Sequence, residues 1–389
     1  SNITTIIAAV ILFAISGGLV RGFAVTLMIG LLSSLLGALV VTRVIFMWVI
    51  DKGLLTSLKT TKIIPDKVFD ILSVAPKFII ASLVVTAISF GTLAFKGKES
   101  FGIDFRGGSQ LHVELAEGKK ISDAQLDEAL KALKMPDGKS IGTYYLQRKS
   151  NATGGEIVAI RGEQQAGPVI EGAVNSKFKD SIKGTSLETV GALIGSESAK
   201  TSMIAMIIAL IGIFVYLLLR YEFAFALGAV VALFHDVLMV PGLCVLFGQE
   251  MSLIHVGALL TIAGYSINDT IVVFDRIRET ITRGGGGTIR ELMNEAICKT
   301  LSRTLLTGPT ALAPMVVLLF LGNPAMTEFA MPITIGVLLG TYSSIFIASP
   351  LVLWYAQKTG QSLKHKVLES HEAARKMEAA VAAAKASGA

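Results

Sequence analysis

Charged residues are scarce in this sequence. Only 16% are Asp, Glu, Lys or Arg, and 52% are apolar before glycine is counted, whereas ordinary soluble domains have about 25% charged residues. Cysteine is scarcer still. The two cysteines, Cys244 and Cys298, stand in or beside apolar segments, which excludes a disulfide framework and offers no metal-ligand spacing. This composition excludes an ordinary soluble domain and indicates an integral membrane protein.

Long apolar runs take the place of the missing charge. A helix needs about 20 mostly apolar residues to cross a bilayer. Because Ser1 leads directly into an apolar run with no basic region before it, the start is not typical of a signal peptide, and we expect the chain to begin inside a larger protein. The sequence predicts an α-helical polytopic membrane bundle of about eight spans, at about 3–18, 23–48, 76–95, 199–219, 223–247, 253–275, 301–321 and 329–356.

Lysine and arginine gather on one side of the predicted spans. The loop 51–77 and the segment 275–303 are basic, whereas the alternate loops "GQEMS" and "GNPAMTE" contain neither residue. Basic loops tend to stay on the cytoplasmic side. We therefore expect a protein of the cell inner membrane with both termini cytoplasmic and the segment 97–198 exported. Topology accounts for the net charge of +6, so the charge does not indicate nucleic acid as a partner.

Residues 97–198 change to a charged, alternating pattern. Ser122 is placed to cap a helix, and Pro168 is placed to open a second one. The order β-α-β-β-α-β predicts an α+β ferredoxin-like fold. The domain contains no nucleophile–base pair and no metal-ligand spacing, which favours a docking or lever domain over an exported enzyme. Six segments show strand or helix patterns, in chain order 109–115, 121–134, 141–148, 156–162, 168–182 and 185–193.

Two segments 306 residues apart align without a gap. They are "FAVTLMIGLLSSLLGALVVTRVIFMW" (23–48) and "FAMPITIGVLLGTYSSIFIASPLVLW" (329–354). The shared "IG" pair and the tryptophan near each end make chance matching of apolar residues the weaker explanation. Both copies run in the same direction, so they predict a parallel repeat. Gly336 and Gly340 form a small-residue face suited to close helix packing.

One predicted span carries charge inside its apolar run. Residues 265–279 read "YSINDTIVVFDRIRE", and no Asp, Glu, Lys or Arg precedes Asp269 in that span. Asp275 lies roughly 9 Å further along a helix, so Asp269 is within the membrane if Asp275 and Arg276 mark the cytoplasmic interface. An isolated carboxylate there costs several kcal/mol. It must find a partner or bind a proton, and Arg303, which opens the next span at a similar depth, is the best-placed partner.

Other polar residues stand near these charges. Asn268 and Ser266 could support Asp269 by hydrogen bonding. His235 and Asp236, in "LFHDV", lie near the middle of another span, where ionisable side chains are more costly still. Two readings of this pair stay open, a part of the functional site and a structural link between helices.

A functional reading is favoured for Asp269 with Arg303, because Ser or Asn would make a static link at lower cost. For Asp275 and Arg276, a plain position at the cytoplasmic interface is favoured. A carboxylate that alternates between pairing with Arg303 and binding a proton is a proton relay, and moving one charge across the bilayer is worth ~2.3 kcal/mol per 100 mV. The pattern predicts a conformational cycle driven by a proton gradient, with H⁺ as coupling ion, no metal, no other cofactor, and the exported domain as the moving part.

Several motifs resemble a known family. "FGIDFRGGSQLHVEL", "VGALIGSESA", "LRYEFAFALGAVVALFHDVLMV", and "YSINDTIVVFDRIRE" followed by "LSRTLLT" resemble SecF, a protein-export membrane subunit. The segment that opens the chain, up to "VVTRVIF", resembles the last two spans of SecD. Together they are similar to the C-terminal part of a fused SecD–SecF protein of the RND superfamily. The resemblance places the family's intramembrane aspartate at Asp269 and its arginine at Arg303.

The resemblance implies an accessory subunit of the Sec protein translocase that uses the proton motive force to promote translocation. It implies as partners a SecYEG-type channel, a SecD half, YajC- or YidC-type subunits, exported polypeptides and membrane lipid. It also implies a division into 1–50 (last two SecD-like spans), 51–75 (cytoplasmic linker), 76–96 (first SecF-like span), 97–198 (exported domain), 199–357 (five-span SecF-like bundle) and 358–389 (cytoplasmic tail).

Two other functions are compatible with the same spans. One is a proton-driven RND-type exporter of small molecules or lipids, although an exported domain of about 100 residues is small for that role. The other is a static scaffold for translocon assembly, in which the charge of Asp269 has no function. An enzyme is not indicated, because no catalytic constellation is present.

Overall fold

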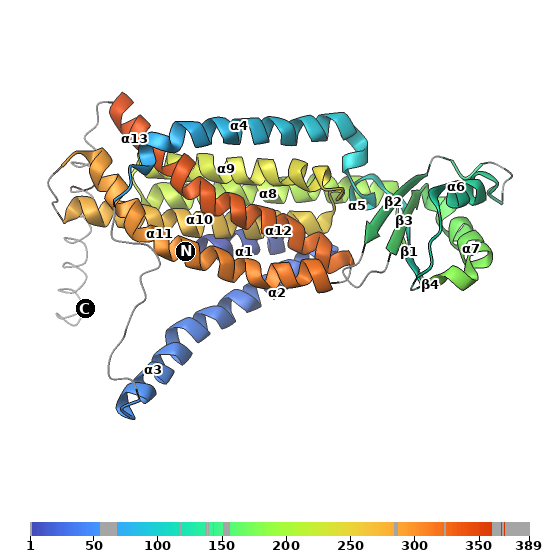
Figure 1. Ribbon diagram of the computed structural model, residues 1–389, viewed down its shortest axis with the longest axis horizontal. Helices are drawn as coiled ribbons and strands as arrows, with labels where there is room; N and C mark the ends of the chain where they lie inside the picture. The colour runs from blue at the N-terminus through green and yellow to red at the C-terminus, as the bar shows by residue number, and fades with distance from the viewer. Residues whose placement is uncertain are drawn as a thin grey trace.

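The protein is a helical bundle with a small sheet domain at one end (Figure 1). The structure is a computed structural model. Most of the predicted linker 51–75 and nearly all of the predicted tail 358–389 lie outside the described residues. The structure describes residues 2–369 apart from 55–67, 117, 137, 139, 143, 151–155, 284–286, 323, 360–366 and 368.

The sheet domain has the predicted order of strands and helices. Its four strands are antiparallel and lie in the order β2-β3-β1-β4, with Leu111 of β1 opposite Ile160 of β3 and Leu187 of β4. This is the ferredoxin-like arrangement, so the predicted fold class is confirmed. The elements are β1 (Gly108–Leu115), α6 (Asp123–Lys131), β2 (Tyr145–Ser150), β3 (Glu156–Gly162), α7 (Gly167–Lys177) and β4 (Ile182–Val190).

Local sequence accounts for these elements. Alternate residues of β1 are buried, because successive side chains of a strand point to opposite faces. As predicted, Ser122 caps α6: its hydroxyl accepts from the backbone N–H of Gln125, and the Gln125 side chain bonds back to the Ser122 N–H. Leu126 and Leu130 of α6 are then buried in a core shared with Ile170 of α7.

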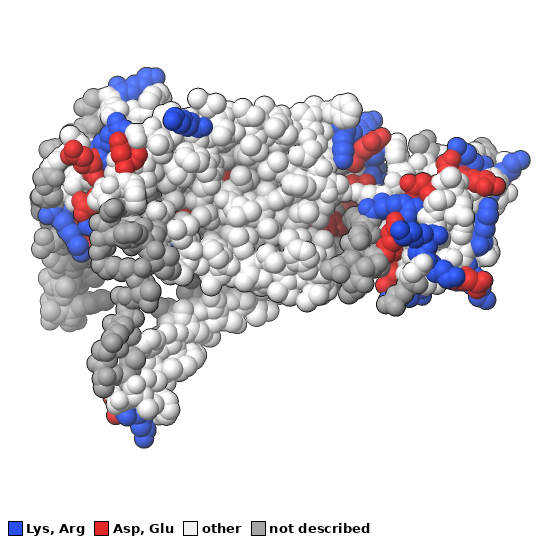
Figure 2. Space-filling model, in the orientation of Figure 1, with Lys and Arg blue, Asp and Glu red and all other residues white. Residues whose placement is uncertain are grey.

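The bundle consists of apolar helices that pack alongside one another (Figure 1). Among the described residues, seven helical segments are long and apolar enough to cross a membrane, and α1 is a shorter apolar helix. On the face shown in Figure 2, charged side chains gather on the sheet domain and at the opposite end of the molecule, whereas the surface between them is nearly uncharged. The protein is therefore a multi-pass membrane protein. Its helices are α1 (Asn2–Ile15), α2 (Gly18–Leu36), α3 (Thr42–Asp51), α4 (Ile71–Lys96), α8 (Ala192–Arg220), α9 (Phe223–Leu246), α10 (Leu253–Thr282), α11 (Ile289–Leu321), α12 (Pro324–Ser343) and α13 (Ser349–Lys358).

Two π-helical turns interrupt otherwise continuous spans. The turn η1 (Gly37–Val41) joins α2 to α3, and η5 (Ser344–Ala348) joins α12 to α13. A shift of 306 residues moves η1 to 343–347, one residue from η5. Phe23 and Phe329, which the same shift superposes, contact each other edge to face with ring centroids 5.6 Å apart. Both observations agree with the parallel repeat that the sequence predicts.

Helix α10 lies at the centre of the bundle. It packs against α1, α9, α11 and α12, and most of its length is buried. By contrast, α3 runs away from the other helices (Figure 1), and its apolar side chains, such as Trp48, are exposed. An apolar exposed helix is suited to lipid or to another membrane segment.

Small residues bring α12 close to α10. A Cβ added at Gly336 would lie 2.4 Å from the side chain of Ile262, and one added at Gly340 would lie 3.2 Å from the Cα of Ser266. These are the two glycines for which the sequence predicts a packing face. Their close approach brings Ser343, the last residue of α12, and Ser344, the first residue of η5, close to polar residues of α9 and α10.

The sheet domain is tied to the start of α10. The Gly102 N–H donates to the carbonyl of Met251 over 2.8 Å. The Leu253 N–H donates to Oδ2 of Asp104 over 3.0 Å. Asp104 belongs to α5 (Ile103–Arg106), a short helix that leads into β1 and packs against α8. A displacement of α10 along its axis would therefore act directly on the sheet domain.

Candidate functional site

Asp269 lies inside the bundle, where three elements meet. Its side chain is on α10 and is 6% exposed. It accepts hydrogen bonds from the Thr304 hydroxyl of α11 at 3.1 Å and from the Ser344 hydroxyl of η5 at 2.7 Å. Two hydroxyl donors compensate part of the cost of burying a carboxylate. Asp269 is therefore held by α11 and by the π-helical turn η5, which follows α12.

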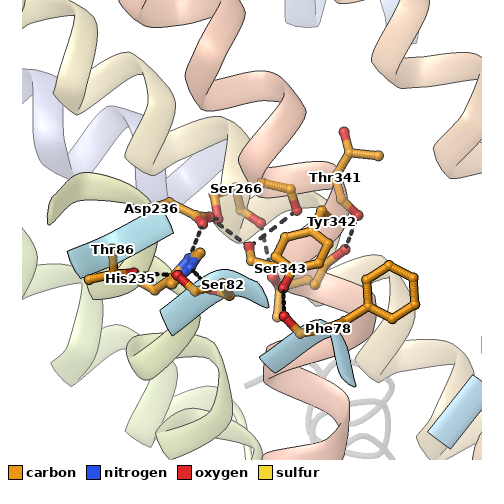
Figure 3. A network of polar contacts seen from close by, with 12 residues as sticks. Phe78, Ser82, Thr86, His235, Asp236, Ser266, Thr341, Tyr342 and Ser343 are labelled. Carbon is orange, nitrogen blue, oxygen red and sulfur yellow. Dashed lines mark hydrogen bonds and ion pairs between the residues drawn. The ribbon is translucent and has the colours of Figure 1, made fainter. Parts of the chain in front are cut away.

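Asp236 lies in a second polar cluster on α9, next to the first. Its carboxylate is fully buried. Its Oδ2 accepts from Ser266 at 2.6 Å and from Ser343 at 2.7 Å, and its Oδ1 contacts Nδ1 of His235 at 2.8 Å (Figure 3). The structure thus brings His235, Asp236 and Ser266 together, and three donors converge on one carboxylate.

The two carboxylates are linked through consecutive serines. Ser343 bonds to Asp236 and Ser344 bonds to Asp269, both over 2.7 Å. In a regular helix, neighbouring side chains point about 100° apart because each turn holds 3.6 residues, so one serine faces α9 and the other α10. The π-helical turn begins at Ser344, and such turns occur often at functional sites.

Each serine has a second acceptor in its own helix. The Ser344 hydroxyl lies 3.1 Å from the Thr341 carbonyl, and the Ser343 hydroxyl lies 3.4 Å from the Gly340 carbonyl. A hydroxyl has one proton to donate and can also accept. When the Ser344 proton points to Thr341, its oxygen is free to accept a hydrogen bond from a protonated Asp269. The site can therefore hold Asp269 with or without a proton.

The Asp236 cluster extends to α4. Nε2 of His235 contacts the Ser82 hydroxyl, and the Thr86 hydroxyl donates to the Ser82 carbonyl over 2.8 Å (Figure 3). A histidine whose Nδ1 donates to a carboxylate has Nε2 free to accept a hydroxyl proton. The Tyr342 hydroxyl beside this chain donates to the Phe78 carbonyl over 2.6 Å. Polar contacts thus run from α10 through α9 to α4.

Arg303, the predicted partner of Asp269, takes a different position. Its side chain is exposed, and no ion pair joins it to Asp269 within the part of the chain that the structure describes. The hydroxyl of Thr304, the next residue, contacts Asp269 instead. Arg303 lines a cavity of about 730 Å³ at the end of the bundle opposite the sheet domain, together with Asn268, Asp275, Arg276, Glu279 and Lys299. Asn268 therefore faces the same cavity as Arg303.

Asp275 and Arg276 lie where a membrane interface is expected. Asp275 accepts from the Tyr221 hydroxyl at 2.9 Å, and Arg276 pairs with Glu279 at 2.6 Å. Burial raises the pKa of Tyr221 above its ordinary value, and the neighbouring Asp275 carboxylate raises it further. These residues join the cavity to the loop between α8 and α9, several turns from Asp236.

The sequence alone did not predict four hydroxyl residues of the site, which are Ser82, Thr304, Ser343 and Ser344. Serine and threonine are common inside membrane helices, where they bond to their own backbone, so none of them stands out alone. The adjacent pair "SS" at 343–344, inside an apolar run, is the one signal that could have found them. In the described ranges, no group of three or more His, Cys, Asp or Glu side chains is placed to hold a metal ion.

Comparison with known proteins matches this architecture to a family. A family model described as "Protein export membrane protein SecD/SecF, C-terminal" matches residues 170–358. The protein translocase subunit SecF of Thermodesulfovibrio yellowstonii is 36% identical over 290 residues, which cover 71% of this chain and 92% of that protein. The protein translocase subunit SecDF of Brucella abortus is 33% identical over 373 residues, which cover 92% of this chain and 47% of that protein.

Solved structures give the same result. The crystal structure of SecDF, a translocon-associated membrane protein from Thermus thermophilus, matches with a TM-score of 0.78 at 32% identity, covering 92% of this chain and 48% of that one. A crystal structure of SecDF in a super-membrane-facing form matches with a TM-score of 0.67 at 30% identity. The chain spans about half the length of these SecDF proteins and nearly the whole of a separate SecF.

Proposed function

Because the chain belongs to the SecD/SecF family of protein-export membrane proteins, we propose that it acts as an accessory subunit of the Sec translocase, driven by the proton gradient. The observation that carries this proposal is the position of Asp269. Its carboxylate is buried between α10, α11 and η5, and the side-chain hydrogen bonds that it accepts from described residues come from two hydroxyls. Hydroxyl partners can reverse their hydrogen bonds when a proton arrives, which a fixed ion pair cannot do.

The proposed step begins at the end of the bundle opposite the sheet domain. The cavity that Arg303 lines reaches Asn268, the residue before Asp269. A proton that binds Asp269 removes the charge that Ser344 and Thr304 stabilise. The Ser344 hydroxyl then turns to the Thr341 carbonyl, 3.1 Å away. Arg303 serves in this scheme as the cation that attracts an ionised Asp269 once its hydroxyl contacts loosen.

Protonation of Asp269 then moves the helices that contact it. Ser343 and Ser344 are adjacent, so a change at Asp269 alters the contact of α12 with Asp236 on α9. Because α12 packs tightly on α10 at Gly336 and Gly340, the two helices shift together. The start of α10 is bonded to Asp104 of the sheet domain. The sheet domain is therefore the part that moves and acts on the exported chain.

The proposed orientation follows from the basic loops. Lys and Arg gather at the end of the bundle opposite the sheet domain, so that end is cytoplasmic and the sheet domain extracytoplasmic. We propose as partners a SecYEG-type channel, a SecD half, YajC- or YidC-type subunits and exported polypeptides. The exposed apolar face of α3 is suited to contact with the SecD half.

The deciding experiment places Asp269→Asn in the full-length protein. Release of an exported client from membrane vesicles is followed with and without a proton gradient. We expect the variant to insert normally and to lose the benefit of the gradient, because the side-chain amide of asparagine does not ionise as a carboxyl group does. Asp275→Asn is the matched control, since Asp275 lies on the same helix and contacts Tyr221 at the interface. It should keep the benefit.

The same experiment separates the alternatives. A static scaffold for translocon assembly predicts that Asp269→Asn keeps the full gradient-dependent release, and that result would end the proton proposal. If the protein exports small molecules or lipids, Asp269→Asn should leave client release normal. A deletion strain should then be more susceptible to drugs. Equal loss in Asp269→Asn and Asp275→Asn would show a general effect of lost charge instead of a proton site.

A further inference from the structure

A groove of about 790 Å³ runs along the side of the bundle, away from the cavity that Arg303 lines. It lies between α4, α9, η5 and α13. Its walls are apolar for most of their length, with Ile79, Leu83, Val231, Ile347, Leu351 and Trp354 among the lining residues. Neither the proton site nor the joint with the sheet domain requires such a groove.

The groove has the length of one leaflet. Along α4 it extends from Leu72 to Thr86, which is about 21 Å at 1.5 Å per residue. Half the hydrocarbon core of a bilayer is about 15 Å thick. The groove can therefore hold an acyl chain for the whole depth of one leaflet and still leave room for a headgroup at its end.

The end near Leu72 is cationic. Arg290 lines the groove there, and its side chain is half exposed. Lys358 follows the lining residue Gln357 and holds its ammonium 4.8 Å from the ring centroid of Trp354, another lining residue. The exposed Lys77 follows the lining residue Pro76. Among the described residues, Asp70 is the carboxylate that pairs with Arg290, at 3.4 Å, and it is outnumbered by the three cations Arg290, Lys358 and Lys77.

The opposite end is polar but already satisfied. Ser82, Thr86 and His235 line it. The Ser82 hydroxyl contacts His235, the Thr86 hydroxyl donates to the Ser82 carbonyl, and His235 contacts Asp236. These side chains have partners inside the bundle, so this end presents methyl, methylene and ring-edge atoms to a ligand. An alkyl chain suits it better than a second polar group.

We propose that this groove binds an anionic phospholipid, with the phosphate near Arg290 and Lys358 and one acyl chain along α4 and α13. Basic pockets between membrane helices recognise anionic headgroups, with about 1 kcal/mol from each Lys or Arg near the surface. The seated chain covers the side of His235 and Ser82 that faces the bilayer. It thereby keeps water away from the Asp236 cluster on that side. The site does not depend on the proton function.

Trp354 supplies a direct readout. This sequence contains two tryptophans, Trp48 and Trp354, so in a protein of this sequence Trp48→Phe leaves Trp354 as the single reporter. The protein is placed in phosphatidylcholine vesicles that contain either brominated phosphatidylglycerol or brominated phosphatidylcholine at equal mole fraction. Bromine quenches tryptophan on contact. We expect the brominated anionic lipid to bind about fivefold more strongly than the brominated zwitterionic lipid at low salt.

Two variants of opposite sign test the headgroup contact. Arg290→Gln should reduce the fivefold preference toward equal binding, whereas Asp70→Asn should keep or increase it, because it removes the carboxylate charge that pairs with Arg290. Arg276→Gln, in the cavity that Arg303 lines, is the matched control and should leave the preference unchanged. Arg290 and Asp70 are both exposed, and Asp70→Asn keeps a side-chain oxygen that can accept from the Asn294 amide.

Three results would overturn the proposal. Equal quenching by the two brominated lipids would mean that the groove holds bulk lipid without recognition. No quenching by either lipid would mean that the groove is closed to lipid. A preference for the anionic lipid that survives Arg290→Gln unchanged would place the headgroup elsewhere on the basic end of the bundle.

Discussion

Ser343 and Ser344 are consecutive residues whose hydroxyls bond to carboxylates on two different helices. Ser343 donates to Asp236 of α9, and Ser344 donates to Asp269 of α10, each over 2.7 Å. No other arrangement among the described residues connects two buried carboxylates through adjacent side chains. The pair makes the end of α12 sensitive to the protonation of either carboxylate, which is the property that a coupling helix needs.

Ser344→Ala should weaken both stability and coupling. The change leaves Asp269 with Thr304 as its remaining hydroxyl partner, and losing a hydrogen bond to a charged group costs about 1.5–3 kcal/mol. We expect a lower melting temperature in detergent and a reduced benefit of the proton gradient in client release by the full-length protein. Ser344→Thr, which keeps a hydroxyl, should restore most of the gradient benefit.

Thr334→Ala is the control for this prediction. The Thr334 hydroxyl lies on α12, which leads directly into η5, and it donates to the Ala330 carbonyl of the same helix. Its removal should change the free energy of unfolding by no more than about 0.5 kcal/mol. The benefit of the proton gradient should stay at the wild-type level. If Thr334→Ala and Ser344→Ala behave alike, the effect belongs to α12 in general and not to the contact with Asp269.

Gly336→Ala should destabilise the bundle. The added methyl group would lie 2.4 Å from the side chain of Ile262, so α12 and α10 would have to move apart, and overpacking of this kind costs about 1–3 kcal/mol. Gly30 is the equivalent glycine of the first repeat copy, and a Cβ there meets nothing within 4 Å. Gly30→Ala should be neutral or slightly stabilising, since alanine favours a helix. Thermal unfolding of the two variants in the same detergent makes the comparison, and equal melting temperatures would contradict it.

Gly195→Ala should loosen the joint between the sheet domain and α8. A Cβ at Gly195 would lie 2.7 Å from the backbone nitrogen of Gly107, which has a positive φ of 74°. The contact is with backbone atoms, which cannot rotate away as a flexible side chain can. The added methyl group should therefore displace α5 from α8. Hydrogen–deuterium exchange at residues 103–106 should accelerate.

The control for the joint is Gly172→Ala in α7. A Cβ at Gly172 meets nothing within 4 Å, and replacing glycine inside a helix should stabilise the sheet domain by about 0.5–1 kcal/mol. Exchange at residues 103–106 should then stay at the wild-type rate. Unchanged exchange in Gly195→Ala would contradict the prediction, because it would show that α5 and α8 accommodate the added methyl group without separating.

Acid should weaken the helix α6 through Asp127. The Lys131 ammonium and the Tyr144 hydroxyl bond to this carboxylate and hold its pKa below its usual value of 3.8. A carboxylate with a lowered pKa in the folded state adds stability above its unfolded pKa, and that stability is lost as the pH falls through the folded pKa. Faster amide exchange in α6 of Asp127→Asn, relative to wild type, should be present near neutral pH and should shrink as the pH falls below 3.8 and through the lowered folded-state pKa. A difference that persists in acid would contradict this role.

Much of the architecture could be predicted from local patterns. Apolar runs indicate spans because a bilayer core admits few charges, and alternation with a capping serine at Ser122 indicates the strands and helices of the sheet domain. The exact offset of 306 residues indicates the repeat. The structure agrees with it, because the equivalent residues Phe23 and Phe329 contact each other. Position in a span also singled out Asp269 and Asp236, because a buried carboxylate is costly wherever its helix packs.

The partners of those carboxylates could not be predicted in the same way. Arg303 was the expected partner of Asp269 because opposite charges at similar depth attract, but depth does not determine which way a side chain points. Glycine contacts at Gly336 and Gly340 set the separation of α12 and α10, and the π-helical turn sets the direction of Ser344. Together they place a hydroxyl at Asp269 where a cation was expected.

The sequence by itself therefore determined the membrane class of the protein, the order and type of its elements, its internal repeat and which residues carry buried charge. Each of these depends on composition or on periodicity along one segment. Only the tertiary structure decided that Asp269 and Asp236 meet neighbouring serines, that Arg303 faces a cavity, and that a groove beside α4 ends at cations. Those facts depend on how closely and at what rotation separate helices pack, and that is set by many weak contacts between residues far apart in the chain.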